Sequence, residues 1–395
     1  MTDLAAAAAS IGRRLCDGAV RHGGRATWLT SRLATGGRRV EWAPAGAGVY
    51  DGTAGIGLFL AELADAEGDP RVATIAGEAA RHAVAGAGRI SPERALGFHQ
   101  GVAGVAVAAA RSGRMLGDDD LVEAAVAVAD PVSERRGAPS GTDLTSGSAG
   151  GVAAMLALSG LGAGDEAVAR AAQLGEETIA AWRPDQTGLA HGASGMGWAL
   201  VELSAETGDD RFAAAGRVAL AHESALFDSR EQNWPDLSDP SGRSFRCGWC
   251  RGAPGIALAR ARSSALLGDE GLRAEAQVGL ATTSRVTRAM LDAQGVDFSL
   301  CHGLAGNAWA LIDAERMLGE PGDGAALAEE IARAGAEHYE GAGRPWPTSV
   351  PVNEGPGLMT GLAGIGLFLL RAAGRPVPSV LLPRSATFAP VVHAD

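Results

Sequence analysis

A Gly-x-x-Gly pair followed by an apolar run recurs seven times along this chain of 395 residues. Successive first glycines are separated by 49, 46, 45, 60, 51 and 58 residues, room for about two helices per unit. Such a period is typical of repeat architectures, in which one unit cannot bury its apolar face alone and stacks on its neighbours. The seven pairs are Gly52/Gly55, Gly101/Gly104, Gly147/Gly150, Gly192/Gly195, Gly252/Gly255, Gly303/Gly306 and Gly361/Gly364.

Each unit is expected to hold an inner helix that begins at the glycine pair and an outer helix that precedes the next loop. The segment 56–63 is apolar on nearly every side, as in a helix buried within a ring. Segment 166–182 carries apolar residues at helical spacing and charged residues on its other faces, as expected of an outer helix. Sustained strand patterns are nearly absent. The sequence therefore predicts an all-α closed ring of seven helical hairpins.

The repeats extend over about residues 50–383, so we expect a single domain covering 1–395, although the length alone would allow two or three domains. An N-terminal helix is expected over 1–25. The Pro-rich tail, 376–395, is expected to extend over the surface. Where the spacing stretches to 60 and 58 residues, long loops containing Pro and Trp interrupt the repeat, and loops of such length are usually functional.

Composition excludes several classes of function. The net charge is -12 and every basic residue is an arginine, with no basic run, so nucleic acid and anionic membranes are poor partners. No segment approaches the ~20 apolar residues that span a bilayer. The N-terminal segment has its acidic residue before its alanine run and its arginines after it, the reverse of a secretory signal. We therefore expect a cytoplasmic protein without a membrane span.

Two cysteines stand at matching points of neighbouring repeats, each two residues before the first glycine of its unit. These are Cys250 and Cys301, and the second is followed directly by His302. If the repeats stack side by side, the two thiols and the imidazole meet. Two sulfur donors and one nitrogen donor, with no obvious fourth, describe a zinc site that keeps one position open, and this mixed set suits zinc better than iron or copper. We expect one zinc ion, Zn2+, on these three residues.

The remaining cysteines leave an alternative open. Cys247 precedes Cys250 in a Cys-x-x-Cys pair and would turn the site into a closed structural site with four ligands. Cys247 lies outside the repeated frame, which favours the open site, and no βαβ context supports a redox pair. Alternatively, these cysteines are small buried residues that bind no metal, and this is what we expect of Cys16.

Three further polar residues lie beside the glycine pairs. His191 directly precedes Gly192 and points to the same mouth, where an imidazole is a natural general acid or base; alternatively it caps the helix turn. Asp143 is near enough to Gly147 to reach this mouth, or to make local turn bonds instead. Asp51 is a weaker candidate that also suits a helix cap.

The glycine-pair repeats, together with the two cysteine segments, resemble the lanthionine synthetase C-like cyclases, which make thioether rings in lanthipeptides. The resemblance covers the chain from about Tyr50 to Pro383. Segments 26–29, 233–236 and 377–382 are most similar to the cyclase domains fused in bifunctional synthetases. The motifs that carry it are Trp249-Cys250-Arg251-Gly252-Ala253-Pro254-Gly255 and Cys301-His302-Gly303.

This resemblance implies an α/α toroid with zinc at one mouth. By motif, its zinc ligands fall on Cys250, Cys301 and His302, its acid/base histidine on His191, and its aspartate on Asp143. It implies an intramolecular Michael-type addition of a peptide cysteine thiolate to dehydroalanine or dehydrobutyrine. The partner would be a dehydrated precursor peptide. The chain has no P-loop, no kinase signature and no room for a dehydratase, so a separate dehydratase is expected.

Two other classes of function stay open from the sequence. The ring could be a zinc-containing binding protein for peptides or small thiols such as glutathione, without ring formation. It could also be a zinc-dependent toroid transferase, which would need basic residues beside the metal to bind a diphosphate, and Arg246 and Arg251 keep that reading open. Paired carboxylates at the mouth would favour a glycosidase instead. The residue that follows the first zinc cysteine differs in chemical type among members of the family, and in this chain it is Arg251.

Overall fold

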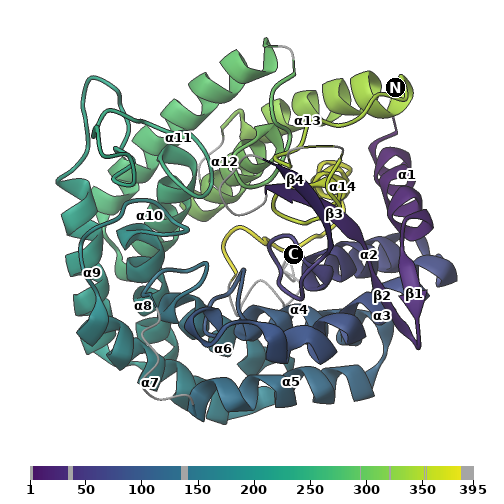
Figure 1. Ribbon diagram of the computed structural model, residues 1–395. Helices are drawn as coiled ribbons and strands as arrows, with labels where there is room; N and C mark the ends of the chain where they lie inside the picture. Colours follow the sequence, from purple (N-terminus) through teal and green to yellow (C-terminus); the bar gives the residue numbers. More distant parts are fainter. Residues whose placement is uncertain are drawn as a thin grey trace, which may run out of the picture.

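The computed structural model describes residues 3–33, 39–134, 141–293, 295–319, 322–350, 352 and 354–383. Over these residues the helices form a closed double ring, and Figure 1 views it along its axis. The predicted all-α toroid of helical hairpins is therefore confirmed.

The inner ring consists of the helices that begin directly after the first glycine of each pair, which serves as the N-cap. They are buried along most of their length because helices or loops surround them on every side. They are α2 (Thr53–Glu67), α4 (Val102–Leu116), α6 (Ser148–Leu158), α8 (Ala193–Thr207), α10 (Ala253–Leu267), α12 (Leu304–Leu318) and α14 (Leu362–Ala372).

The second glycine of each pair is required by close packing against the preceding loop. In all seven repeats a Cβ at this position would overlap the carbonyl oxygen of the residue three before the first glycine, such as Phe98 for Gly104 and Leu300 for Gly306. Only glycine lets the helix start this close to its own loop.

The outer ring consists of amphipathic helices that bury one face against the inner ring. They are α3 (Pro70–Gly86), α5 (Asp119–Glu134), α7 (Gly164–Ala181), α9 (Asp210–Ser224), α11 (Glu270–Leu291) and α13 (Gly324–Gly335). Single helical turns extend or connect these helices: η1 (Ala87–Arg89), η2 (Pro92–Arg94), η3 (Ser159–Ala163) and η4 (Ala336–Gly341).

The two ends of the chain together make the seventh hairpin. Helix α1 (Leu4–Asp17) packs on the inner helix α14 and takes the place of its outer partner. Arg14 of α1 ties this junction to the last long loop through ion pairs of 2.5 Å to Glu340 and 2.9 Å to Glu354. The helix expected over 1–25 thus exists, but it ends at Asp17.

A belt of backbone hydrogen bonds joins the seven loops at the mouth of the ring. In each repeat the N–H of the residue two before the first glycine donates to the carbonyl of the matching residue in the next repeat. The bonds run from Tyr50 to His99 (2.9 Å), His99 to Thr145 (3.2 Å), Thr145 to Ala190 (3.2 Å), Ala190 to Cys250 (3.3 Å), Cys250 to Cys301 (3.4 Å), Cys301 to Met359 (2.9 Å) and Met359 back to Tyr50 (2.7 Å).

Buried ion pairs join neighbouring inner helices in the same repeated register. Each acid and each arginine stands ten residues after the first glycine of its unit. Arginine is suited to this because its planar guanidinium binds a carboxylate through two hydrogen bonds. The pairs are Glu62–Arg111 between α2 and α4, Glu202–Arg262 between α8 and α10, and Asp313–Arg371 between α12 and α14.

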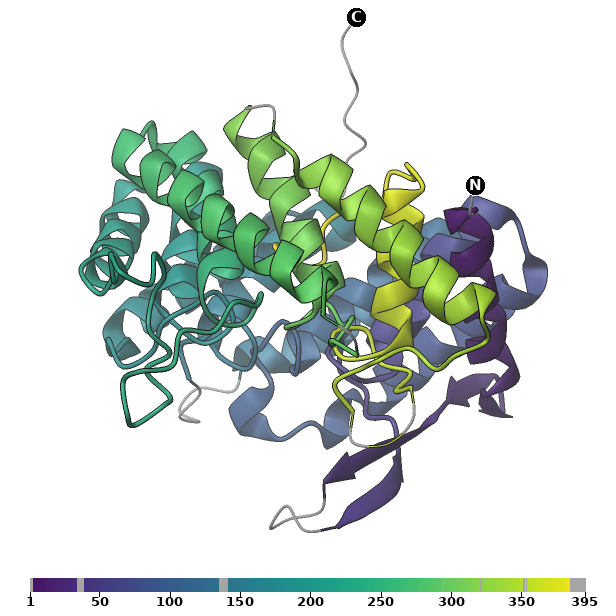
Figure 2. The same ribbon diagram turned by 90° about the horizontal axis from the view of Figure 1, so that it is seen from above.

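Two β-hairpins precede the first repeat, so the expectation of almost no strands is wrong for residues 20–44. They pair β1 (Val20–His22) with β2 (Arg25–Thr27) and β3 (Leu29–Leu33) with β4 (Val40–Pro44). The first turn consists of Gly23 and Gly24, with φ of 55° and 72°, the conformation of a two-residue hairpin turn. The second hairpin projects from one side of the ring (Figure 2).

The described part of the C-terminal tail lies inside the ring, so the expected surface location is wrong for residues 377–382. Val377, Val380, Leu381 and Leu382 are buried, with exposed fractions of 0–6%. The carbonyl of Leu381 accepts a 2.8 Å hydrogen bond from Trp249 Nε1. These apolar side chains fill the centre of the ring, where Figure 1 shows the tail. Residues 384–395 lie outside the described residues.

One helical run, Ser148–Ala181, is long and apolar enough to be a candidate membrane span, and half of its most apolar window is buried. The run comprises α6, η3 and α7. It is interrupted at Gly162, where φ is 126°, and α7 packs back against α6. Its hydropathy is that of a core hairpin.

We expect Gly104→Ala to destabilise the protein by about 3 kcal/mol, because the added Cβ overlaps the carbonyl of Phe98 and forces the start of α4 away from its loop. Urea denaturation followed by circular dichroism measures the change. Gly88→Ala is the control: this exposed glycine of η1 has no atom within 4 Å of the added carbon, and its free energy of unfolding should stay within about 0.5 kcal/mol. Equal stability of the two variants would contradict the packing argument.

Candidate metal centre

The structure brings together the three residues that the sequence predicts as metal ligands. Cys250 lies in the loop before α10, and Cys301 and His302 lie in the loop before α12. Their ligand atoms all lie within 4.8 Å of one another. The belt hydrogen bond from Cys250 N to Cys301 O holds the two loops side by side. Repeat stacking therefore produces this cluster.

The two thiols and the imidazole interact even without a metal. The hydrogen bond from Cys301, followed by that from His302, lowers the pKa of Cys250 to about 5. The same bond, together with burial, raises the pKa of Cys301. The hydrogen bond with Cys250 raises the pKa of His302. The lowered pKa favours the thiolate form of Cys250, which is the form of a cysteine that binds a metal ion.

The carboxylate of Asp297 lies close to one ring nitrogen of His302. Asp297 Oδ2 lies 3.5 Å from His302 Nε2, while Asp297 itself accepts hydrogen bonds from Ser299 N (2.7 Å) and from Ser349 Oγ. With Nε2 turned to the carboxylate, Nδ1 is the nitrogen left for a metal. Histidine ligands are typically oriented by such a partner. The sequence analysis missed Asp297, because no other repeat has an acidic residue six positions before its first glycine.

A tyrosine contacts the cysteine pair from the first repeat. The Tyr50 hydroxyl donates a 2.8 Å hydrogen bond to Cys301 Sγ. Burial raises the pKa of Tyr50 well above its usual range, so the hydroxyl stays protonated. The sequence analysis missed this residue as well, although it occupies the frame position that Cys250 and Cys301 occupy in their own repeats.

His191 and Asp143, the predicted acid/base pair, lie beside this cluster. Asp143 Oδ1 is 3.9 Å from His191 Nδ1. The carboxylate is held by Ser146, whose N–H donates to Oδ1 at 2.7 Å and whose hydroxyl donates to Oδ2 at 3.0 Å. The charge of His191 contributes to the lowered pKa of Cys250, so the imidazole is within electrostatic reach of the thiols.

Cys247 does not join the cluster. Among the described residues, the group of potential ligands contains Cys250, Cys301 and His302 but not Cys247. Burial raises the pKa of the Cys247 thiol to about 12, so it stays neutral. The geometry favours the open site over a closed site with four ligands. Cys16 is buried, as expected.

Asp51 does not cap α2, because Gly52 is the N-cap residue of this helix and no side chain caps it. The structure does not place it in the ligand group of the described residues.

The long loop 228–247 is fixed to the mouth by charge pairs. Asp236, almost fully buried, lies 2.9 Å from Arg246 Nε and accepts a 2.9 Å hydrogen bond from Arg251 Nη1. Arg251 also donates to Gln186 Oε1 at 2.8 Å. Both arginines are therefore neutralised in part by one carboxylate, which weakens the case for a diphosphate site.

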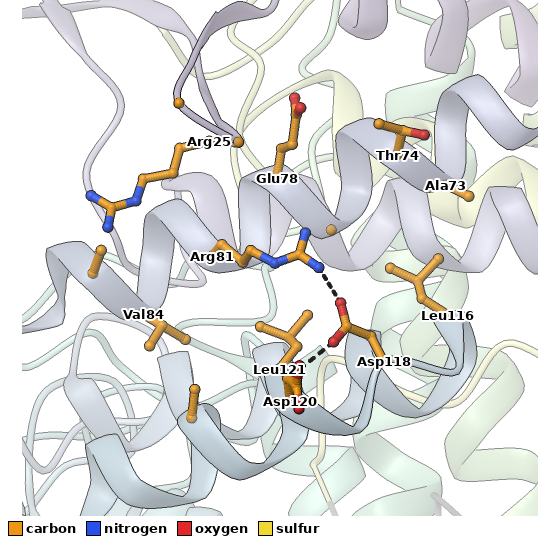
Figure 3. Close-up of a pocket in the computed structure, with 15 residues that line it drawn as sticks. Arg25, Ala73, Thr74, Glu78, Arg81, Val84, Leu116, Asp118, Asp120 and Leu121 are labelled. Atoms are coloured by element: carbon orange, nitrogen blue, oxygen red, sulfur yellow. Dashed lines mark hydrogen bonds and ion pairs between the residues drawn. The ribbon is translucent and has the colours of Figure 1, made fainter.

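A surface pocket of about 720 Å³ lies elsewhere, on the outside of the ring between the β1–β2 turn, α3 and α5. Figure 3 shows that the ion pair of Arg81 and Asp118 crosses it. None of the cluster's cysteines and histidines lines this pocket. The candidate metal centre is therefore separate from this pocket.

A family model described as lanthionine synthetase C-like protein matches residues 43–382. The chain belongs to this family. Comparison with curated proteins gives no match.

Solved structures agree with the fold of this lanthionine synthetase C-like protein. Nisin cyclase matches with a TM-score of 0.60 and 16% identity, over 82% of this chain and 87% of the other. The unsaturated glucuronyl hydrolase from Bacillus sp. GL1 matches with a TM-score of 0.47 and 12% identity, over 96% and 97%. A sugar epimerase from a ruminal bacterium matches with 0.44 and 12%, over 92% and 96%.

We expect Cys301→Ala to lose stoichiometric zinc while Cys247→Ala keeps it, because only Cys301 belongs to the ligand cluster. Metal analysis of the purified variants after dialysis gives the ratio of zinc to protein. Equal loss in both variants would support the closed site with four ligands instead.

Asp297→Asn should weaken zinc binding by about 10- to 100-fold, since the amide removes the negative charge that orients His302 and makes it a better donor. Competition with a chromophoric chelator measures the affinity. Asp165→Asn, at an exposed carboxylate of α7, is the control. An affinity of Asp297→Asn equal to that of this control would exclude the supporting role.

Proposed function

We propose that this protein is a zinc-dependent lanthipeptide cyclase. The reaction is the intramolecular addition of peptide cysteine thiolates to dehydroalanine or dehydrobutyrine, which forms lanthionine and methyllanthionine rings. The proposal is supported most directly by the ligand group Cys250, Cys301 and His302 at the mouth of a lanthionine synthetase C-like ring.

The donor set fits one Zn2+. Two sulfur donors and one imidazole nitrogen, within 4.8 Å of one another, match a catalytic site with three protein ligands, and the thiolate character of Cys250 supplies the charge. When bound, the zinc supplies positive charge and an open coordination position, which lower the pKa of an incoming thiol.

The reaction requires one proton to move, and nothing is oxidised or reduced. The substrate thiol loses its proton, and a sulfur–carbon bond forms at the β-carbon of the dehydro residue. The π electrons of its double bond move to give an enolate, and a proton then reaches the α-carbon. All atoms of the linear peptide remain in the cyclised product.

His191 is the group that we assign to this proton. It stands at the mouth with its side chain 36% exposed, so it is accessible to a peptide. Its Nδ1 faces Asp143, which leaves Nε2 free to accept the proton from the thiol and to deliver it to the α-carbon. Asp143 stabilises the imidazolium between these two transfers. Ser146 fixes the carboxylate for this role.

The substrate must already contain dehydro residues. We infer a dehydrated precursor peptide as substrate and a separate dehydratase as its supplier. This assignment depends on the chemistry of the addition, which consumes a double bond that the proposed reaction does not create.

Incubation with a dehydrated precursor peptide that contains cysteine and dehydroalanine tests the function. Free thiol, counted by alkylation and mass spectrometry, should disappear faster than without protein. His191→Ala should slow this loss by about 100-fold or more and keep its zinc, because only proton transfer is removed. His22→Ala, at an exposed residue of β1, is the control and should retain the full rate. Thiol that persists with the unaltered protein as long as without it rejects the proposed function.

A further inference from the structure

Within the part of the chain that the structure describes, the hydroxyl of Tyr50 donates a hydrogen bond to the sulfur of a proposed metal ligand. The distance from Tyr50 Oη to Cys301 Sγ is 2.8 Å, well within the range of hydrogen bonds to sulfur. Cys301 is only 1% exposed, so the bond is made away from water. A hydrogen bond in such surroundings is electrostatically stronger than one in solvent.

Ring closure places this tyrosine. Tyr50 and Cys301 are 251 residues apart in the chain. They become neighbours because Cys301 N donates to Met359 O at 2.9 Å and Met359 N donates to Tyr50 O at 2.7 Å. The first repeat thereby lies against the last two, and its frame position carries a phenol instead of a thiol.

We propose that Tyr50 is a hydrogen-bond donor to the Cys301 sulfur when that sulfur binds the metal, and that it weakens the electron donation of Cys301 to the metal. The inference rests on the proposed function and adds a positioning residue to it. Tyr50 does not touch the substrate in this scheme. It acts through Cys301.

The hydrogen bond from Tyr50 affects how strongly the metal attracts an incoming thiolate. Two thiolates cancel the charge of Zn2+, so an incoming thiolate gains little attraction unless charge is drawn from the first two. A hydrogen bond to a thiolate draws charge toward the donor and leaves the metal more positive. Partners in the second layer around a metal commonly tune it in this way. The substrate thiol should then ionise at lower pH.

Cobalt substitution makes the effect visible without any peptide. Thiolate-bound cobalt(II) has a sulfur-to-metal charge-transfer band, whose energy rises as the sulfur holds its electrons more tightly. Tyr50→Phe in the full chain should keep one cobalt per chain and shift this band to longer wavelength. In the cyclisation assay, the pH at which the rate is half-maximal should rise, and the rate at neutral pH should fall by about tenfold.

The chain has two tyrosines, and the second provides a matched control. Tyr339 lies in η4, where its ring packs against Phe298 and Trp346. Tyr339→Phe makes the same chemical change away from the metal, so its cobalt spectrum and pH profile should match those of the unaltered protein. Tyr50→Phe with the same band position and the same pH midpoint as this control overturns the inference.

A second measurement covers the case in which Tyr50→Phe fails to fold. In the Tyr339→Phe background, growth on 3-fluorotyrosine labels Tyr50 alone, keeps its shape and makes it a stronger hydrogen-bond donor. The charge-transfer band should then shift to shorter wavelength. An unmoved band overturns the inference.

The two proposals fail in different ways. Cobalt bands that shift as described, in a protein that forms no thioether, support the role of Tyr50 and reject the cyclase function. Normal ring formation with unmoved bands supports the cyclase and rejects the role of Tyr50. An unaltered protein that binds no cobalt and no zinc overturns both.

Discussion

The belt of backbone hydrogen bonds at the mouth is the constraint on which the rest of the structure depends. It joins seven loops through one bond per repeat and closes from Met359 to Tyr50. The glycine pairs make it possible, because each inner helix must start within van der Waals contact of its own loop. Once the loops are held in this register, matching frame positions of neighbouring repeats lie side by side, as Cys250 and Cys301 do.

The parts of the structure that repeat were predictable from sequence. The glycine pairs gave the starts of the inner helices, and the shared frame of Cys250 and Cys301 gave the ligand cluster, because stacking of repeats places equal positions side by side. His191 was predicted in the same way, since it directly precedes its glycine as His302 does. Asp143 was predicted from its nearness to Gly147, and it lies 3.9 Å from His191. The ion pairs between inner helices follow the same rule, because each partner stands ten residues after the first glycine of its unit. Their positions are therefore also predictable from the sequence.

The parts that depend on a single occurrence were not predictable. Asp297 reaches His302 from the position six residues before the first glycine, and no other repeat has an acidic residue at that position. The strands of residues 20–44 are too short for an alternating pattern, although Gly23-Gly24 is a recognisable hairpin turn. The tail carries prolines that suggest an exposed segment. Its valines and leucines are instead buried in the centre of the ring. This burial was not predictable, because the space that they fill forms only when the ring is closed.

The junction of α1 with α14 has a consequence for how the molecule is made. The ring closes at a seam, where α1 and the first repeat meet α14 of the last repeat. During synthesis Tyr50 leaves the ribosome long before Met359. The surface of the first hairpin that contacts the last repeat therefore stays exposed until the last repeat has been made. The cysteine cluster gains its phenol neighbour only at that final docking step. A chain that lacks the last repeat would lack the backbone hydrogen bonds of Met359 that hold Tyr50 beside Cys301.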